Sequence, residues 1–179
     1  MKIKVADIKY ETMTDGTGFR TSIYCQGCRH HCKNCHNPQT WDFNSGIEFD
    51  LAAKEEIFEQ LNKDYISGIT FSGGDPLHKN NIDEVLDLCK YIRKNFPTKT
   101  IWIYTGYTWD YIFDITNTVD VFHNQIREEI LKHCDVLVDG KFIKELADVN
   151  YHWAGSTNQR VIDVQKSLEK GDAVLWGTF

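Results

Sequence analysis

The chain has 179 residues, with 20 Lys and Arg against 26 Asp and Glu and a formal net charge of −6. This acidic balance argues against a nucleic-acid-binding protein, and no apolar run approaches the ~18 residues of a membrane helix. The length predicts a single domain over residues 1–179. Because its start has no apolar signal-peptide core, the chain is expected in the cytoplasm, where thiols stay reduced.

Strand and helix signals alternate along the chain. Residues 20–25 predict the first strand, and a cysteine-rich loop follows to about residue 47. Asp50 is a suitable N-cap for the first helix. Asn80 or Asn81 is expected to cap the second helix, and Pro97 marks its end. The remaining predicted elements are strands at 66–72, 100–104, 135–139 and 160–164 and a helix near 124–132.

This alternation predicts the fold class. Apolar strands between helices imply an α/β protein with a parallel sheet. A full eight-stranded barrel takes ~250 residues, so we expect a partial, open parallel (β/α) barrel with helices on its outer face. Functional groups in such folds gather at the C-terminal ends of the strands. Four polar or glycine-rich segments follow predicted strands and should converge there: residues 26–47, 73–76, 104–107 and 139–140.

Four of the six cysteines, beginning with Cys25, lie within 11 residues, which indicates a metal site rather than a disulfide framework. Cys28, Cys32 and Cys35 form a Cys-x3-Cys-x2-Cys loop whose soft thiolates suit an iron–sulfur cluster, zinc or Cu(I). Three protein ligands would leave one iron of a four-iron cluster open to a substrate. The competing interpretation is a zinc site that adds Cys25. Against it, zinc ribbons separate their cysteine pairs by ~15–20 residues, and Cys25 follows the core-facing alternation of its strand.

Three other segments each have a structural interpretation beside a functional one. Residues 73–76 form either a strand-to-helix turn or a ligand site, in which Asp75 would hold an ammonium group. Asp139 is either a turn residue or a ligand contact. Arg160 ends a polar segment that is either a solvated loop or a site for a carboxylate or phosphate.

Two further groups of side chains are not expected to bind a metal. Cys89 lies in a helical apolar stripe and Cys134 at a helix–strand junction, so both are expected in the core. His30, His31 and His36 belong to a polar loop and are interpreted as solvent-facing.

The motifs resemble those of the radical S-adenosylmethionine superfamily, whose members share the spacing of Cys28, Cys32 and Cys35. Within it, the chain closely resembles the activating proteins of anaerobic (class III) ribonucleotide reductase. Two differences are Asn34, where many superfamily members carry an aromatic residue, and Asp75, where many carry Glu. The matching stretches lie in family order between about residue 15 and residue 163: 26–37, 70–77, 102–107, 135–140 and 155–160.

The resemblance implies two cofactors and their sites. Cys28, Cys32 and Cys35 would hold a [4Fe-4S] cluster whose fourth iron binds the amino and carboxylate groups of S-adenosylmethionine. The residues implied to contact S-adenosylmethionine are Asn34, Cys35 and His36 near the adenine and Gly73, Gly74 and Asp75 at the amino group. Further contacts at the rim are expected from Tyr104, Thr105, Asp139, Asn158 and Arg160. No catalytic residue is implied beyond the cluster and the bound cofactor.

The resemblance also implies the reaction and the partners. Electron transfer from the reduced cluster would cleave S-adenosylmethionine into methionine and a 5′-deoxyadenosyl radical, which would take hydrogen from a glycine of the large reductase subunit. An electron donor such as flavodoxin is implied as a second partner, and neither nucleic acid nor a membrane is expected to bind. Two alternatives stay open: an activator of another glycyl-radical enzyme, such as pyruvate formate-lyase, and a non-catalytic zinc-binding module. Iron with sulfide, rather than zinc, would distinguish the enzymes from the module.

Overall fold

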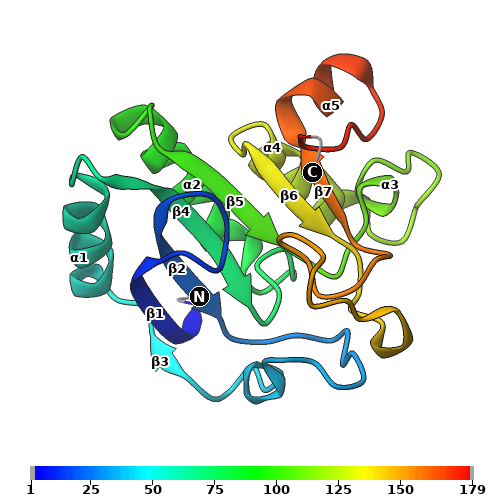
Figure 1. The fold of residues 1–179 in the computed structure, drawn as a ribbon, viewed down its shortest axis with the longest axis horizontal. Coiled ribbons are helices and arrows are strands. Elements are labelled where there is room, and N and C mark those ends of the chain that lie inside the picture. The colour runs from blue at the N-terminus through cyan, green and yellow to red at the C-terminus, as the bar shows by residue number, and fades with distance from the viewer. Residues whose placement is uncertain (1–2, 178–179) are drawn as a thin grey trace.

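The computed structural model describes residues 3–177, so the first two and last two residues of the predicted 1–179 domain lie outside the described range. The fold is mixed α/β, as the alternating pattern predicts, with one seven-stranded sheet in the order β3-β1-β2-β4-β5-β6-β7 (Figure 1). The strands are β1 (Lys4–Thr12), β2 (Phe19–Cys25), β3 (Ile47–Glu48), β4 (Ile66–Gly73), β5 (Thr100–Tyr104), β6 (Val136–Asp139) and β7 (Arg160–Asp163). The helices are α1 (Leu51–Leu61), α2 (Ile82–Asn95), α3 (Trp109–Ile112), α4 (Val121–Leu131) and α5 (Val164–Lys170).

The helix boundaries follow the capping signals in part. Asp50 caps α1 by accepting a hydrogen bond from the Ala53 N–H at 2.9 Å. Asn81 occupies the cap position of α2, but its side chain makes no capping bond. Its amide donates instead to the carbonyls of Gln26 at 3.1 Å and Asp75 at 2.8 Å. Asn81 therefore ties the cysteine loop to the segment that follows β4.

The centre of the sheet is parallel and its two sides are antiparallel. Strands β2, β4, β5 and β6 pair in parallel, as expected for strands joined through helices. The predicted fifth strand, β7, runs antiparallel to β6. It is not a further parallel strand because residues 140–159 begin and end at the same end of the sheet, where Asp139 pairs with Arg160, and do not cross to the other end. Strand β1 was not predicted from the sequence. It pairs antiparallel with β2, to which the turn around residues 13–18 connects it.

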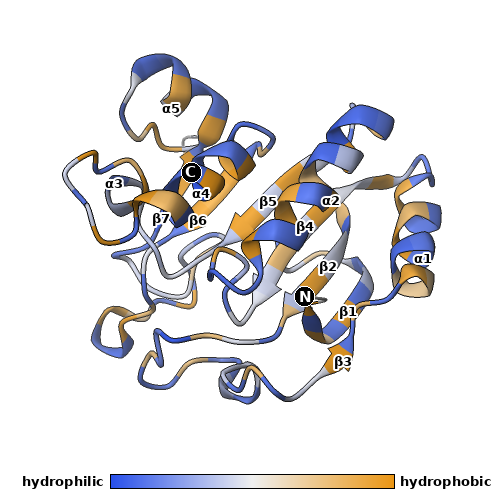
Figure 2. Cartoon of the chain, turned by 180° about the vertical axis from the view of Figure 1, so that it is seen from behind, coloured by the Kyte–Doolittle hydropathy of each residue, from blue (hydrophilic) through white to orange (hydrophobic). Residues whose placement is uncertain are grey.

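The two faces of the sheet are covered differently. Helices α2 and α4 lie across one face, here called the helix face, as the rear view shows (Figure 2). The main core lies beneath them and includes Ile103, while its neighbour Trp102 lies on the opposite face, as the alternation of a strand requires. That opposite face, the loop face, is covered by chain without helices, including Trp153 and Trp176. Within residues 3–177, no helix is both long and apolar enough to cross a membrane.

Candidate iron–sulfur and cofactor site

The loop after β2 folds into a compact unit against the strand ends. Backbone N–H groups of Gly27 and Cys28 donate to the carbonyls of Thr40 at 2.7 Å and Trp41 at 3.2 Å, which closes the loop on itself. The buried Gln26 amide nitrogen donates into the same loop, to Gln39, Asp42 and Ser45. The loop, which includes the short 3-10 helix Pro38–Thr40, is therefore held in a defined shape by these hydrogen bonds.

Cys25 stays outside this loop. It is 0% exposed in the main core at the end of β2, and Cys89 and Cys134 are also 0% exposed, which confirms the three core predictions. None of the six cysteines, all within the described residues, forms a disulfide. Three thiols are thus held in the core by packing, and the three others remain in the loop.

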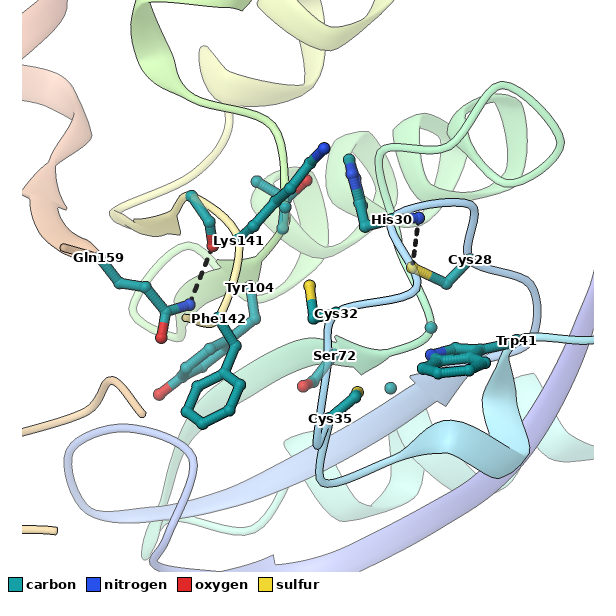
Figure 3. Close-up of a pocket in the computed structure, with 15 residues that line it drawn as sticks. Cys28, His30, Cys32, Cys35, Trp41, Ser72, Tyr104, Lys141, Phe142 and Gln159 are labelled. Carbon is teal, nitrogen blue, oxygen red and sulfur yellow. Dashed lines mark hydrogen bonds between the residues drawn. The ribbon is translucent and has the colours of Figure 1, made fainter. Parts of the chain in front are cut away.

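The loop cysteines direct their sulfur atoms toward one cavity (Figure 3). Two of the sulfur atoms accept hydrogen bonds from backbone N–H groups: Cys28 from His30 at 3.4 Å and Cys35 from Asn37 at 3.3 Å. Backbone donors of this kind stabilise metal-bound thiolates and tune the metal centre.

Burial makes two of these thiols, Cys28 and Cys32, poorer acids. It raises the pKa of Cys28 to about 11, with Asp75 adding to the effect, and it also raises the pKa of Cys32. A bound cation would supply the charge that stabilises the thiolates. Three soft sulfur donors, two of them with N–H groups directed at them, fit an iron–sulfur cluster.

Segments from four strand ends form the cavity wall. Residues Ser72–Gly74 end β4, Tyr104–Gly106 end β5, Gly140–Phe142 follow β6, and Gln159 precedes β7. Their meeting point is the one expected for the carboxyl ends of parallel strands. The structure thus brings Gly73, Gly74, Tyr104 and Thr105 of the predicted set to the same cavity as the cysteines.

Glycines in the wall permit this close approach. A Cβ on Gly73 would lie 2.7 Å from the backbone of Tyr24, and one on Gly74 would lie 2.5 Å from the Gly27 carbonyl oxygen. Gly73 also has a φ of +94°, which glycine tolerates best. At this pair of positions, the absence of a side chain allows the cysteine loop to rest on the end of β4.

Asp75 is buried directly behind the wall, with 1% of its surface exposed. Its Oδ1 accepts from the Leu77 N–H at 2.9 Å and the Thr105 hydroxyl at 2.8 Å. Its Oδ2 lies 2.6 Å from His30 Nε2 and accepts from the Gly106 N–H at 3.0 Å. His30, Thr105 and Gly106 line the cavity, so this one carboxylate fixes three parts of its wall.

Asn34 and His36 lie at the exposed outer side of the loop. Asn34 has a φ of +61°, a left-handed conformation in which asparagine is enriched and a bulky aromatic residue is strained. This backbone geometry gives a physical reason for asparagine at the position before Cys35. The His36 ring lies 6.0 Å from the Phe142 ring, measured between centroids.

The other predicted rim residues, Asp139, Asn158 and Arg160, bond to groups of the protein around the cavity. Asp139 is 1% exposed, and its Oδ2 accepts from Arg160 at 2.6 Å and from the Trp109 N–H at 2.7 Å. Arg160 also pairs with Asp110 at 2.7 Å, and these charges raise its pKa. Asn158 donates to the Lys141 carbonyl at 2.8 Å. These residues hold the segments on either side of the cavity in place.

Eight residues that line the cavity are not among the predicted site residues: His30, Trp41, Ser72, Gly106, Gly140, Lys141, Phe142 and Gln159. Lys141 and Phe142 directly follow the predicted 139–140 segment, so their place in the chain was the available signal. His30 was interpreted as solvent-facing, but it lies on Asp75 and packs its ring 4.9 Å from the Tyr107 ring. Trp41 belongs to the predicted 26–47 segment, but no sequence feature singled it out within that segment.

Comparison with known protein families shows the class of protein to which the chain belongs. The family model of a 4Fe-4S single cluster domain matches residues 14–162. This range contains the cysteine loop and every segment of the cavity wall. The chain is therefore an iron–sulfur protein with a single-cluster domain.

Curated relatives then give the particular family. Anaerobic ribonucleoside-triphosphate reductase-activating protein from Escherichia coli K12 is 38% identical over 151 residues, which cover 83% of this chain and 91% of the relative. The proteins of the same name from Haemophilus influenzae and Enterobacteria phage T4 are 37% and 36% identical, over 81% and 82% of this chain and 88% and 85% of their own. The chain belongs to the family of anaerobic ribonucleoside-triphosphate reductase-activating proteins.

Proposed function

We propose that this protein generates a glycyl radical on an anaerobic ribonucleoside-triphosphate reductase by reductive cleavage of S-adenosylmethionine at a [4Fe-4S] cluster. The observation that carries the proposal is the gathering of three loop cysteines in one cavity walled by four strand ends. Family membership supports the same reaction. In this proposal residues 1–179 are one radical S-adenosylmethionine domain, and its sheet is a partial, open barrel.

Cys28, Cys32 and Cys35 would hold the cluster. When bound and reduced, it supplies the one electron that divides S-adenosylmethionine into methionine and the 5′-deoxyadenosyl radical that removes hydrogen from the reductase glycine. The protein contributes binding, orientation and protection from water. A cluster bound to thiolates requires reduced cysteines, so the proposal places the protein in the cytoplasm.

The cavity wall would orient S-adenosylmethionine. Gly73 and Gly74 expose backbone to the cavity, where the amino group is predicted to bind, and Asp75 adds its charge from behind through His30. Tyr104 and Thr105 form the adjoining wall, and Lys141 adds a positive charge suited to the carboxylate. Asn34, Cys35 and His36 remain the predicted contacts of the adenine.

The partners follow from the reaction. The large subunit of the reductase would present its glycine to the cavity, and a donor such as flavodoxin would deliver the electron. A polypeptide substrate needs a lateral entrance, which suits a sheet that is not closed into a full barrel. The net charge of −6 gives no support for a nucleic-acid partner.

The test is anaerobic reconstitution with iron and sulfide, followed by dithionite, S-adenosylmethionine and the reductase from the same source. We expect 5′-deoxyadenosine, and a glycyl doublet in the electron paramagnetic resonance spectrum of the reductase. The doublet should vanish with Cys32→Ala. A doublet on pyruvate formate-lyase but not on the reductase would assign the chain to another activator, and zinc without iron would show a binding module.

A further inference from the structure

Trp41 is fixed against the cysteine loop by its backbone and its ring. Its carbonyl accepts from the Cys28 N–H at 3.2 Å, so it is tied directly to a predicted cluster ligand. Its indole stacks on His31 with ring centroids 4.6 Å apart and an interplanar angle of 20°. Both contacts hold the indole in one place at the cavity that contains the three sulfur atoms.

The indole nitrogen of Trp41 is buried and has no hydrogen-bond partner within residues 3–177. Leaving such a donor unpaired costs about 1–3 kcal/mol, and native structures contain few of them. The nitrogen-bearing edge of the ring faces the cysteine sulfur atoms in the close-up (Figure 3). An indole N–H can only donate, so any partner is an acceptor, and Trp41 differs from other unpaired groups in that its ring lines the cavity of the three cysteines.

We propose that the Trp41 Nε1–H donates a hydrogen bond to a sulfur atom of the bound cluster and so makes the cluster easier to reduce. This inference rests on the proposed cluster site. One-electron reduction adds negative charge to the cluster, which strengthens a hydrogen bond to its sulfur. Hydrogen bonds to sulfur and solvent exposure are among the factors that set the potential of iron–sulfur clusters. Trp41 would act on both, because its ring also lines the cavity and shields that side of it from solvent.

The first experiment compares midpoint potentials of the reconstituted wild type, Trp41→Phe and Trp153→Phe by redox titration with electron paramagnetic resonance detection. Phenylalanine keeps an aromatic ring and removes the N–H. For Trp41→Phe we expect full iron and sulfide but a more negative potential, with the equilibrium constant for reduction lowered roughly tenfold, or about 59 mV for one electron. Trp153 is the matched control, because its buried indole nitrogen also lacks a partner among the described residues but packs on Trp102 of the loop face.

The second experiment does not require the Trp41→Phe variant. Wild type with isotopically labelled indole nitrogen is reduced, and pulsed electron paramagnetic resonance measures coupling between the cluster spin and that nitrogen. We expect a coupling that Trp153→Phe retains, and this result decides the case if Trp41→Phe fails to hold a cluster. Two results would overturn this inference and leave the proposed function intact. One is a wild-type cluster that shows no such coupling, and the other is an unchanged midpoint potential in Trp41→Phe. A wild type that binds no iron would overturn the proposed function with it.

Discussion

The two faces of the central strands use the same backbone for different purposes. On the helix face, Ile23, Phe71 and Ile103 are 0% exposed and form part of one apolar core. On the loop face, the alternate positions Ser22 and Trp102 belong to a mixture of polar and aromatic side chains. Because side chains alternate along a strand, one face carries most of the hydrophobic stabilisation while the other is free to carry polar groups. The candidate site lies at neither face but at the strand ends, where both faces meet the cysteine loop.

Arg20 shows how ordered the loop face is. Its guanidinium is completely buried and donates to the Thr70 hydroxyl at 2.8 Å and to the carbonyls of Ile69 and Thr100 at 2.7 and 2.9 Å. It also lies 5.4 Å from the Trp102 ring centroid. Burial lowers its pKa to about 10, so it stays charged at neutral pH. On the loop face, hydrogen bonds therefore fix a buried cation in place, whereas the helix face is stabilised by apolar packing.

The largest expected effect is the difference in cluster content between variants of the loop cysteines and the variant of the strand cysteine. Cys28→Ala, Cys32→Ala and Cys35→Ala each remove a predicted ligand, so we expect loss of the cluster or of activity after reconstitution. Cys25→Ala changes the helix face only and should retain iron. Iron and sulfide analysis with the visible absorption spectrum measures this difference.

Two further variants serve as controls for that comparison. Cys89→Ala and Cys134→Ala remove buried thiols from the same core and should also retain iron. Equal iron loss in Cys25→Ala and Cys28→Ala would contradict the three-ligand assignment and return the site to four cysteines.

A smaller effect is expected from neighbouring residues on opposite faces of β2. Ile23→Ala leaves a cavity in the main core and should lower the free energy of unfolding by about 3 kcal/mol. Ser22→Ala removes a buried hydroxyl that has no hydrogen-bond partner in the described part of the chain. Its free energy of unfolding should therefore stay within about 0.5 kcal/mol of the wild-type value or rise. Urea unfolding of the cluster-free proteins measures both, and similar losses would show that the loop face is packed as critically as the helix face.

The fold was predictable from sequence where apolar periodicity decides the structure. The four parallel strands, α1 and α2 all carry continuous or striped apolar residues, and the structure has each of them. Strand β1 mixes charged and apolar residues, and three of its nine residues are exposed, so its apolar pattern gave a weaker signal. The direction of β7 depends on the path of residues 140–159 in space, which no local pattern encodes.

The site was predictable only where the spacing of residues in the sequence indicates a ligand set. Three cysteines at fixed intervals indicate a cluster regardless of the surrounding fold. The buried contacts of Asp75 could not be predicted, because Thr105 and Gly106 lie 30 and 31 positions away in sequence. The role of Trp41 likewise depends on how the loop closes. Residues that reach the cavity through tertiary contacts therefore required the structure.

The smallest effect compares two carboxylates at opposite ends of the strands. Asp75 follows β4 beside the cavity, whereas Asp135 precedes β6, where it accepts from the Ile101 N–H and from Arg93, both at 2.7 Å. The Asp75 carboxylate contacts four groups through its two oxygens, whereas asparagine at this position has one oxygen acceptor. His30, Thr105 and Gly106 would therefore lose their common anchor. We expect Asp75→Asn to keep its cluster but to bind S-adenosylmethionine roughly ten- to 150-fold more weakly. Asp135→Asn should alter stability without changing that affinity, and a titration in which both variants bind like the wild type would leave Asp75 as a turn residue only.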